Sequence, residues 1–109
     1  MPFYRYVSTL ETSYVKVHGR VPNVDHLGVP KTVYFTDALF VSASIAETEL
    51  RIGKFHPAGS RLSPTDRFDL DLTGISYIGP TVIVGSPSGM NEFVTSGSPS
   101  VSLITALLP

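Results

Sequence analysis

The sequence predicts an α+β domain built mainly from antiparallel strands. Helical patterns are confined to the first half of the chain and strand patterns fill the second half, an order that favours helices segregated from an antiparallel sheet. Nine glycines and nine prolines among 109 residues imply many turns between short elements. A chain of this length supports one modest core, so we expect a single domain over residues 1–109.

Composition and charge exclude several classes of function. The 42% hydrophobic and 16% charged residues are typical of a globular chain. We expect no membrane contact, because no apolar run is long enough to span a bilayer and no signal-peptide pattern opens the chain. A net charge of −1 without a basic stripe argues against a nucleic-acid patch. The absence of cysteine excludes disulfides and thiol chemistry and leaves localisation open.

The first nineteen residues predict a strand followed directly by a capped helix. The aromatic residues of Phe3–Val7 favour a strand. Ser8 and Glu11 have the spacing of a capping box, and Gly19 stands where a helix commonly ends. One helical face is apolar, formed by Leu10, Tyr14 and Val17.

A loop, a second strand and a second helix follow. Residues 20–31 lack periodicity and predict the loop, and residues 32–35 predict the strand. Thr36 or Asp37 could cap the next helix, although residues 40–41 favour a strand instead. The helix is predicted from an amphipathic stripe of Leu39, Ala43, Ala46 and Leu50.

The second half of the chain contains four strand candidates. They follow a turn-rich segment at 52–64 and comprise residues 67–72, 81–84, 91–95 and 101–108. The first alternates apolar with polar residues, and its acidic pair, Asp69 and Asp71, is best explained by a solvated strand face. The second is continuously apolar after its threonine, which predicts a buried strand.

The stretch 86–99 holds the most informative of these strands. Glycines and prolines bound Asn91–Thr95 on both sides. Alternation places Glu92 and Val94 on one face and Phe93 on the other. Glu92 is therefore an acid on a short rigid element beside a loop that could cover a ligand. The alternative interpretation is an exposed strand glutamate without a role.

Other familiar chemistry is not predicted. The histidines lack metal-ligand spacing, so we expect no metal site from His18, His26 and His56. No lysine-bearing glycine-rich loop is present to hold a phosphate, and no serine stands in a nucleophile elbow.

Three segments together resemble the ADP-ribosyltransferase-like domains, particularly the small ones found as bacterial polymorphic toxins. Tyr4-Arg5-Tyr6 leads into a capped helix, VYFTD at 33–37 opens a second helix, and MNEFVTSG at 90–97 precedes a closing apolar strand. This is similar to the family's series of arginine, aromatic or hydroxyl residue, and glutamate. The resemblance implies a split β-sandwich of mainly antiparallel strands, with two helices in the N-terminal half, that clasps NAD in a central cleft.

The resemblance implies that Glu92 is the catalytic residue and bonds the nicotinamide-ribose hydroxyls. Cleavage of the nicotinamide–ribose bond passes through an oxocarbenium-like state, as glycoside cleavage does. A carboxylate aimed at that sugar stabilises positive charge that is larger in the transition state than in the ground state.

The resemblance also implies the NAD-binding residues. Arg5 would hold the pyrophosphate or the adenosine-side ribose, through a fork that suits phosphate oxygens. The backbone of Tyr6 would bond the nicotinamide amide, Tyr34 or Phe35 would stack on the nicotinamide ring, and Thr36 would support the site. Because adjacent strand residues face opposite ways, we expect Tyr34 toward the ligand and Phe35 toward the core. The alternative interpretation makes Arg5 a surface residue and the aromatic pair core.

Two departures from the family bear on the acceptor. Phe35-Thr36-Asp37 stands where arginine-modifying relatives carry Ser-Thr-Ser, and Met90 stands where they carry a second acid or amide. That second group helps to recognise the acceptor, so we expect water or an acceptor other than arginine.

The sequence therefore predicts an NAD-consuming toxin or effector domain that transfers ADP-ribose to an unknown acceptor. An NAD glycohydrolase toxin is the first alternative, and a non-catalytic β-rich module that binds a protein through its tyrosines and phenylalanines is the second. A toxin of this kind would be expected to have an immunity protein or antitoxin. It would act in the cytoplasm, and delivery as a secreted toxin domain is compatible with the resemblance.

Overall fold

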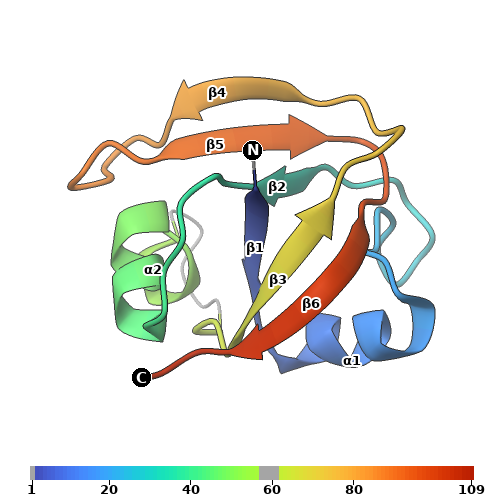
Figure 1. The fold of residues 1–109 in the computed structure, drawn as a ribbon, viewed down its shortest axis with the longest axis horizontal. Coiled ribbons are helices and arrows are strands. Elements are labelled where there is room, and N and C mark those ends of the chain that lie inside the picture. The colour runs from blue at the N-terminus through green and yellow to red at the C-terminus, as the bar shows by residue number, and fades with distance from the viewer. Residues whose placement is uncertain (1, 57–61) are drawn as a thin grey trace.

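Two three-stranded antiparallel sheets and two helices form the fold in a computed structural model, which describes residues 2–56 and 62–109 (Figure 1). The elements are β1 (Phe3–Val7), α1 (Thr9–His18), β2 (Val33–Phe35), α2 (Ala43–Leu50), a 3-10 turn η1 (Gly53–Phe55), β3 (Asp66–Asp71), β4 (Ile78–Val82), β5 (Asn91–Thr95) and β6 (Ser100–Ala106). The predicted α+β class and the order of strands and helices are confirmed.

The two sheets meet at one pair of residues. One sheet has the strand order β1-β3-β6 and the other β2-β5-β4, with antiparallel neighbours throughout. The amide N–H of Tyr4 donates to the Thr36 carbonyl at 2.7 Å, and the amide N–H of Thr36 donates to the Tyr4 carbonyl at 2.9 Å. Figure 1 shows β1 running away from β2 beyond this point, so the sheets diverge from a common junction.

Helix α1 is confirmed, but its predicted capping box is wrong, and its predicted apolar face lies on the surface. Gly19 ends the helix in the left-handed region, at φ 74°. The Ser8 side chain makes no capping hydrogen bond, and the Glu11 carboxylate accepts from Arg5. The core contact comes from Thr12 and Val15, which lie on the other side of the helix. The predicted face is exposed, including Leu10 and Val17 at 78% each.

Helix α2 begins later than predicted. Its N-cap is Ser42, whose hydroxyl accepts a hydrogen bond from the Ile45 amide N–H at 3.5 Å. Leu39 lies before the helix and is exposed, whereas the predicted core residues Ala46 and Leu50 are buried.

The predicted burial of the segment 81–84 is also wrong. Strand β4 spans Ile78–Val82, lies at the edge of its sheet and is exposed at every residue. Pro80 lacks an amide N–H, which is compatible with an edge position. An apolar run cannot distinguish a buried strand from an edge strand, because only the sheet order decides which sides are covered.

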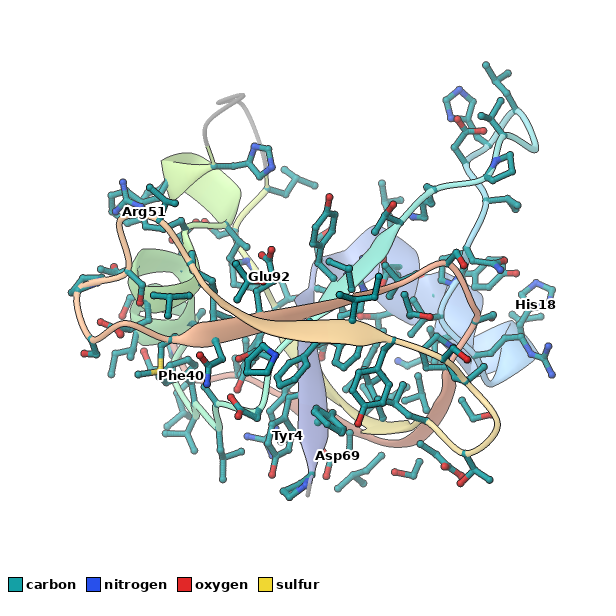
Figure 2. All side chains as sticks on the ribbon, turned by 90° about the horizontal axis from the view of Figure 1, so that it is seen from above. Tyr4, His18, Phe40, Arg51, Asp69 and Glu92 are labelled. Carbon is teal, nitrogen blue, oxygen red and sulfur yellow. The ribbon has the colours of Figure 1, made fainter. Side chains whose placement is uncertain are left out.

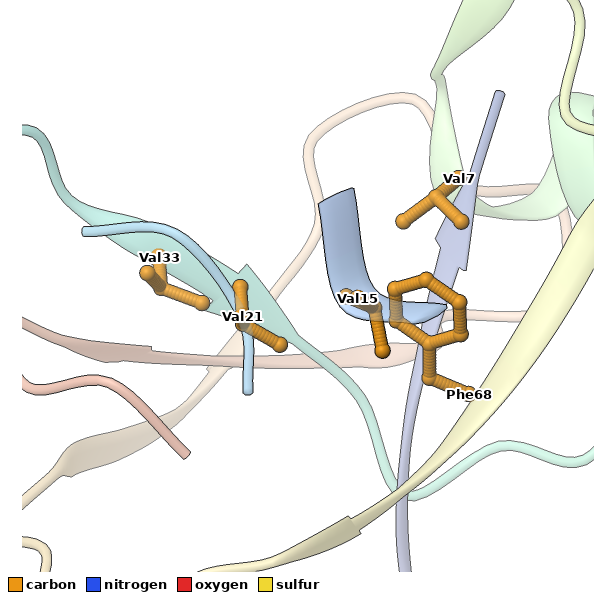
Figure 3. Packing of buried hydrophobic residues seen from close by; sticks show 5 residues of the cluster. All are labelled: Val7, Val15, Val21, Val33 and Phe68. Carbon is orange, nitrogen blue, oxygen red and sulfur yellow. The ribbon is translucent and has the colours of Figure 1, made fainter. Parts of the chain in front are cut away.

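Three apolar clusters hold the layers together. Figure 3 shows the first, in which Val7, Val15, Val21, Val33 and Phe68 pack between α1 and both sheets. The second joins Phe3 of β1 to aromatic residues of the other sheet, and the third packs α2 against β1. β1 contributes residues to all three clusters and therefore packs against the other sheet and against both helices. Within residues 2–56 and 62–109, none of the helices combines the length and apolarity needed to cross a bilayer.

Candidate functional site

A pocket lies where the two sheets diverge. The empty volume between its lining residues is about 370 Å³, which includes space open to solvent. Residues from β1, β2, β5 and the end of α2 line it: Tyr4, Arg5, Tyr6, Tyr34, Phe35, Thr36, Leu50, Ile52, Ile83 and Glu92. The fold thus brings together every position that the sequence singled out, from three segments of the chain.

Glu92 contributes the free carboxylate of this pocket. Phe93 and Thr95 are buried on one face of β5, so the predicted alternation, with Glu92 on the opposite face, is confirmed. Figure 2 shows Glu92 on β5 between α2 and β2. Within the described part of the chain its carboxylate has no hydrogen bond or ion pair, and partial burial raises the pKa of Glu92 above its ordinary 4.5. An unpaired acid with a raised pKa in a pocket is a candidate for chemistry.

Arg5 lines the same pocket but is held by three hydrogen bonds. Its Nε donates to Oε2 of Glu11 at 2.6 Å, and its Nη2 donates to Oε1 of the same carboxylate at 2.8 Å. Its Nη1 donates to the Tyr34 carbonyl at 2.6 Å. Sequence reasoning missed this partnership because it assigned Glu11 to a helix cap. The available signal was an opposite charge six positions away, across an abrupt turn from strand to helix.

Tyr6 lines the pocket, and its side-chain hydroxyl is engaged within the fold. Its hydroxyl donates to the Ala38 carbonyl at 2.7 Å and accepts from the Phe40 amide N–H at 2.6 Å. Burial raises the pKa of Tyr6 to about 12, even though the Phe40 hydrogen bond opposes the shift. Backbone groups two residues apart in a strand point to the same edge. The N–H and C=O of Tyr6 therefore face the same edge as those of Tyr4, beyond the point where β2 has diverged.

The aromatic residues of β2 face opposite ways, as predicted. Tyr34 is 51% exposed, whereas Phe35 is 3% exposed. The Phe35 ring stacks on Phe93, with 5.5 Å between ring centroids, and meets Phe3 edge-on. Phe35 is thus committed to the core, and Tyr34 is the β2 aromatic that is free to contact a ligand.

Thr36 is buried, lines the pocket and makes hydrogen bonds within the fold. Its hydroxyl donates to the Asn91 carbonyl at 2.7 Å and accepts from the Ala38 amide N–H at 3.1 Å. These bonds tie the end of β2 to β5, next to the backbone bridge with Tyr4. Thr36 therefore holds Glu92's strand against β2, and its hydroxyl is already committed within the protein.

The opposite wall of the pocket is apolar and was not predicted. It consists of Leu50 and Ile52 at the end of α2, together with Ile83 from the β4–β5 connection. The Glu49 carboxylate anchors that connection by accepting from the Ser88 amide N–H at 3.2 Å and the Ser88 hydroxyl at 3.1 Å. These residues are far apart in sequence, so no local pattern could have grouped them.

Other charged clusters in the described residues have structural explanations. Asp71 accepts from the amide and hydroxyl of Thr73, and Asp69 lies 3.6 Å from Nε of Arg67. No group of three His, Cys, Asp or Glu side chains suited to a metal occurs in the described residues. A second hollow of about 610 Å³ is lined by Thr32, Ser76, Tyr77, Ile78, Val94, Thr95 and Ser96. It contains no charged residue, so we locate the candidate site in the first pocket.

Comparisons with protein-family models, with curated proteins and with solved structures find no match to this chain.

Proposed function

We propose that this chain is an NAD-consuming domain of the ADP-ribosyltransferase type, acting as a toxin or effector. The observation that carries the proposal is the pocket itself, where Arg5, Tyr6, Tyr34 and Glu92 converge from both sheets. Two antiparallel sheets joined at a single bridge are compatible with the split β-sandwich of such domains. The pocket is partly open to solvent, and we propose that the nicotinamide-ribose half of NAD binds there.

The free groups of the pocket match the parts of nicotinamide riboside. Tyr34 offers an exposed aromatic face for the cationic ring, an interaction favoured by cation–π attraction. The Tyr6 main chain offers one donor and one acceptor side by side, which is the complement of a carboxamide. The apolar wall of Leu50, Ile52 and Ile83 would exclude water from the ring.

Glu92 would act as an ionised carboxylate toward the ribose. In the reaction, the bond between ribose C1′ and the nicotinamide nitrogen breaks, and its electron pair returns to the ring nitrogen. The acceptor's nucleophilic atom bonds C1′ and loses its proton. Glu92 has no internal counter-ion in the described residues, so its charge would be available to stabilise the oxocarbenium-like state between these events.

The acceptor is proposed to be water or a group other than arginine. Met90 packs against the cluster of Tyr4, Tyr6, Ala46 and Leu50 and brings no polar side-chain group to the pocket rim. An NAD glycohydrolase is therefore retained as the alternative activity, with water as the acceptor. A toxin of either kind would need an immunity protein or antitoxin in the cell that makes it.

A second candidate function, a non-catalytic protein-binding module, is favoured by one observation. Leu10, Tyr14 and Val17 form an exposed apolar stripe on α1, away from the pocket. Apolar residues gathered in this way on a surface commonly mark a protein contact.

Incubation of the protein with NAD labelled in its adenylate half, with and without a cell lysate, tests these candidates. Nicotinamide release is expected from the enzyme and not from a binding module. Label on a macromolecule identifies a transferase, whereas free labelled ADP-ribose as the sole product identifies a glycohydrolase. No nicotinamide release under either condition would contradict the proposed function.

A further inference from the structure

Glu11 and Arg5 form a partly buried ion pair at the pocket. The side chains are 14% and 18% exposed, respectively. The carboxylate binds one edge of the guanidinium, through Nε at 2.6 Å and Nη2 at 2.8 Å, and the Tyr34 carbonyl holds Nη1 from a second direction. The arginine is thereby fixed by groups from α1 and β2, although it is carried by β1.

The guanidinium still has unused donors. It carries five N–H groups, of which the described residues engage three. One N–H remains on Nη1 and one on Nη2. Two such nitrogens form the end-on fork that binds phosphate oxygens in a bidentate manner. Arg5 lines the pocket and its side chain is 18% exposed, so we assign these two donors to a ligand in the pocket.

We propose that Glu11 is a positioning residue, which holds Arg5 so that its two remaining donors form a preset fork for the diphosphate of NAD. This inference rests on the proposed function, in which Arg5 binds phosphate oxygens. A free arginine loses rotamer entropy when a ligand fixes it. A side chain already fixed by Glu11 has lost much of this freedom before the ligand arrives.

Charge alone would give Glu11 the opposite effect. The pocket side chains Arg5 and Glu92, together with Glu11, sum to −1 when both glutamates are ionised, a balance that disfavours a diphosphate. If Glu11 acted only through its charge, its removal would tighten the binding of anions. If Glu11 positions the fork, its removal weakens that binding despite the gain in positive charge. The two effects therefore differ in sign.

Titration calorimetry with inorganic pyrophosphate and with NAD distinguishes the positioning effect of Glu11 from its charge effect. The proteins compared are wild type, Glu11→Gln and Glu11→Ala. Groups that orient metal ligands contribute about 10–100-fold to metal affinity, and we apply the lower end of that scale to Glu11. We expect pyrophosphate binding to weaken about 10-fold in Glu11→Ala, with Glu11→Gln intermediate because it keeps one acceptor oxygen. Asp71→Asn is the control, because it removes the same charge outside the pocket and should leave affinity unchanged.

Tighter or unchanged pyrophosphate binding by folded Glu11→Gln would overturn the inference. A lower melting temperature would not rescue it, because loss of stability without loss of binding means that the Arg5–Glu11 pair only stabilises the fold. Absence of pyrophosphate binding to wild type would overturn it as well. If binding follows the expected order but NAD releases no nicotinamide, the positioning role stands and the proposed activity fails.

Discussion

The residues that line the pocket fall into two groups, those engaged by the protein and those left free. Arg5, Phe35 and Thr36 are committed to hydrogen bonds or aromatic packing within the fold. Glu92 and Tyr34 have no such commitment of their side-chain polar or aromatic groups in the described residues. The difference indicates two roles: Phe35 and Thr36 set the shape of the pocket, and Glu92 and Tyr34 are available to a ligand. Arg5 belongs to both groups, because the described residues engage three of its five N–H donors and leave two.

The strongest test of this division compares the neighbours Phe35 and Tyr34. Truncation of a buried phenylalanine typically costs about 3–5 kcal/mol, so Phe35→Ala should unfold at much lower denaturant concentration. Tyr34→Ala should keep most of the stability but lose most NAD turnover. Chemical denaturation and nicotinamide release, measured on both variants, check the contrast. Equal losses of stability in Phe35→Ala and Tyr34→Ala would contradict the assignment of Phe35 to the core and of Tyr34 to the ligand.

Arg5→Lys should affect both stability and binding. If Arg5 served only to bind phosphate, the variant would bind NAD more weakly with little change in melting temperature. The bidentate pair with Glu11 alters that expectation, because lysine has no planar fork to satisfy a partly buried carboxylate. We expect about 1–3 kcal/mol of lost stability and about 10-fold weaker NAD binding. An unchanged melting temperature would show that the pair contributes nothing to the fold.

The pH dependence should follow Glu92. Its pKa is raised by burial, so the ionised form is lost as the pH falls through a value above 4.5. Turnover should therefore fall with the pH in that window, while the contribution of Glu92 to stability increases, because protonation removes a partly buried charge. A pH series of initial rates, with melting temperatures measured in parallel, checks both signs. A rate loss centred below 4.5 would contradict the raised pKa.

The smallest effect is expected on the exposed face of α1. Leu10→Ser should change stability by less than about 0.5 kcal/mol, since surface substitutions rarely do more. Val15→Ser, on the buried side of the same helix, is the comparison and should be strongly destabilising. A large loss of stability for Leu10→Ser would mean that α1 packs against the protein through the face of Leu10, Tyr14 and Val17.

Local patterns in the sequence were sufficient for much of the fold. Strand Asn91–Thr95 was predicted with its observed bounds and facing, because alternation and flanking turn residues are local signals. The buried side of α1 could not be read from the sequence, because the spacing of Leu10, Tyr14 and Val17 defines a stripe but not the side on which a sheet will lie. The burial of 81–84 was wrong because an edge position depends on strand order.

Six of the ten residues that line the candidate pocket were singled out from the sequence, but the contacts between them and their neighbours were not. Arg5, Tyr34 and Glu92 were singled out from short motifs, and the fold places them on one pocket. The Arg5–Glu11 pair and the Glu49–Ser88 anchor depend on how separate elements pack, which no single segment encodes.

The most direct test of the central claim is nicotinamide release from NAD by wild type and Glu92→Gln. The substitution keeps the shape of the side chain and removes its charge, and loss of one preorganised electrostatic contact typically lowers a rate about 100- to 1,000-fold. Asp71→Asn serves as the matched control, since it removes a carboxylate outside the pocket. We predict that Glu92→Gln loses turnover by this factor at an unchanged melting temperature, whereas Asp71→Asn keeps the wild-type rate. Equal turnover in wild type and Glu92→Gln would contradict the assignment of Glu92 as the catalytic carboxylate.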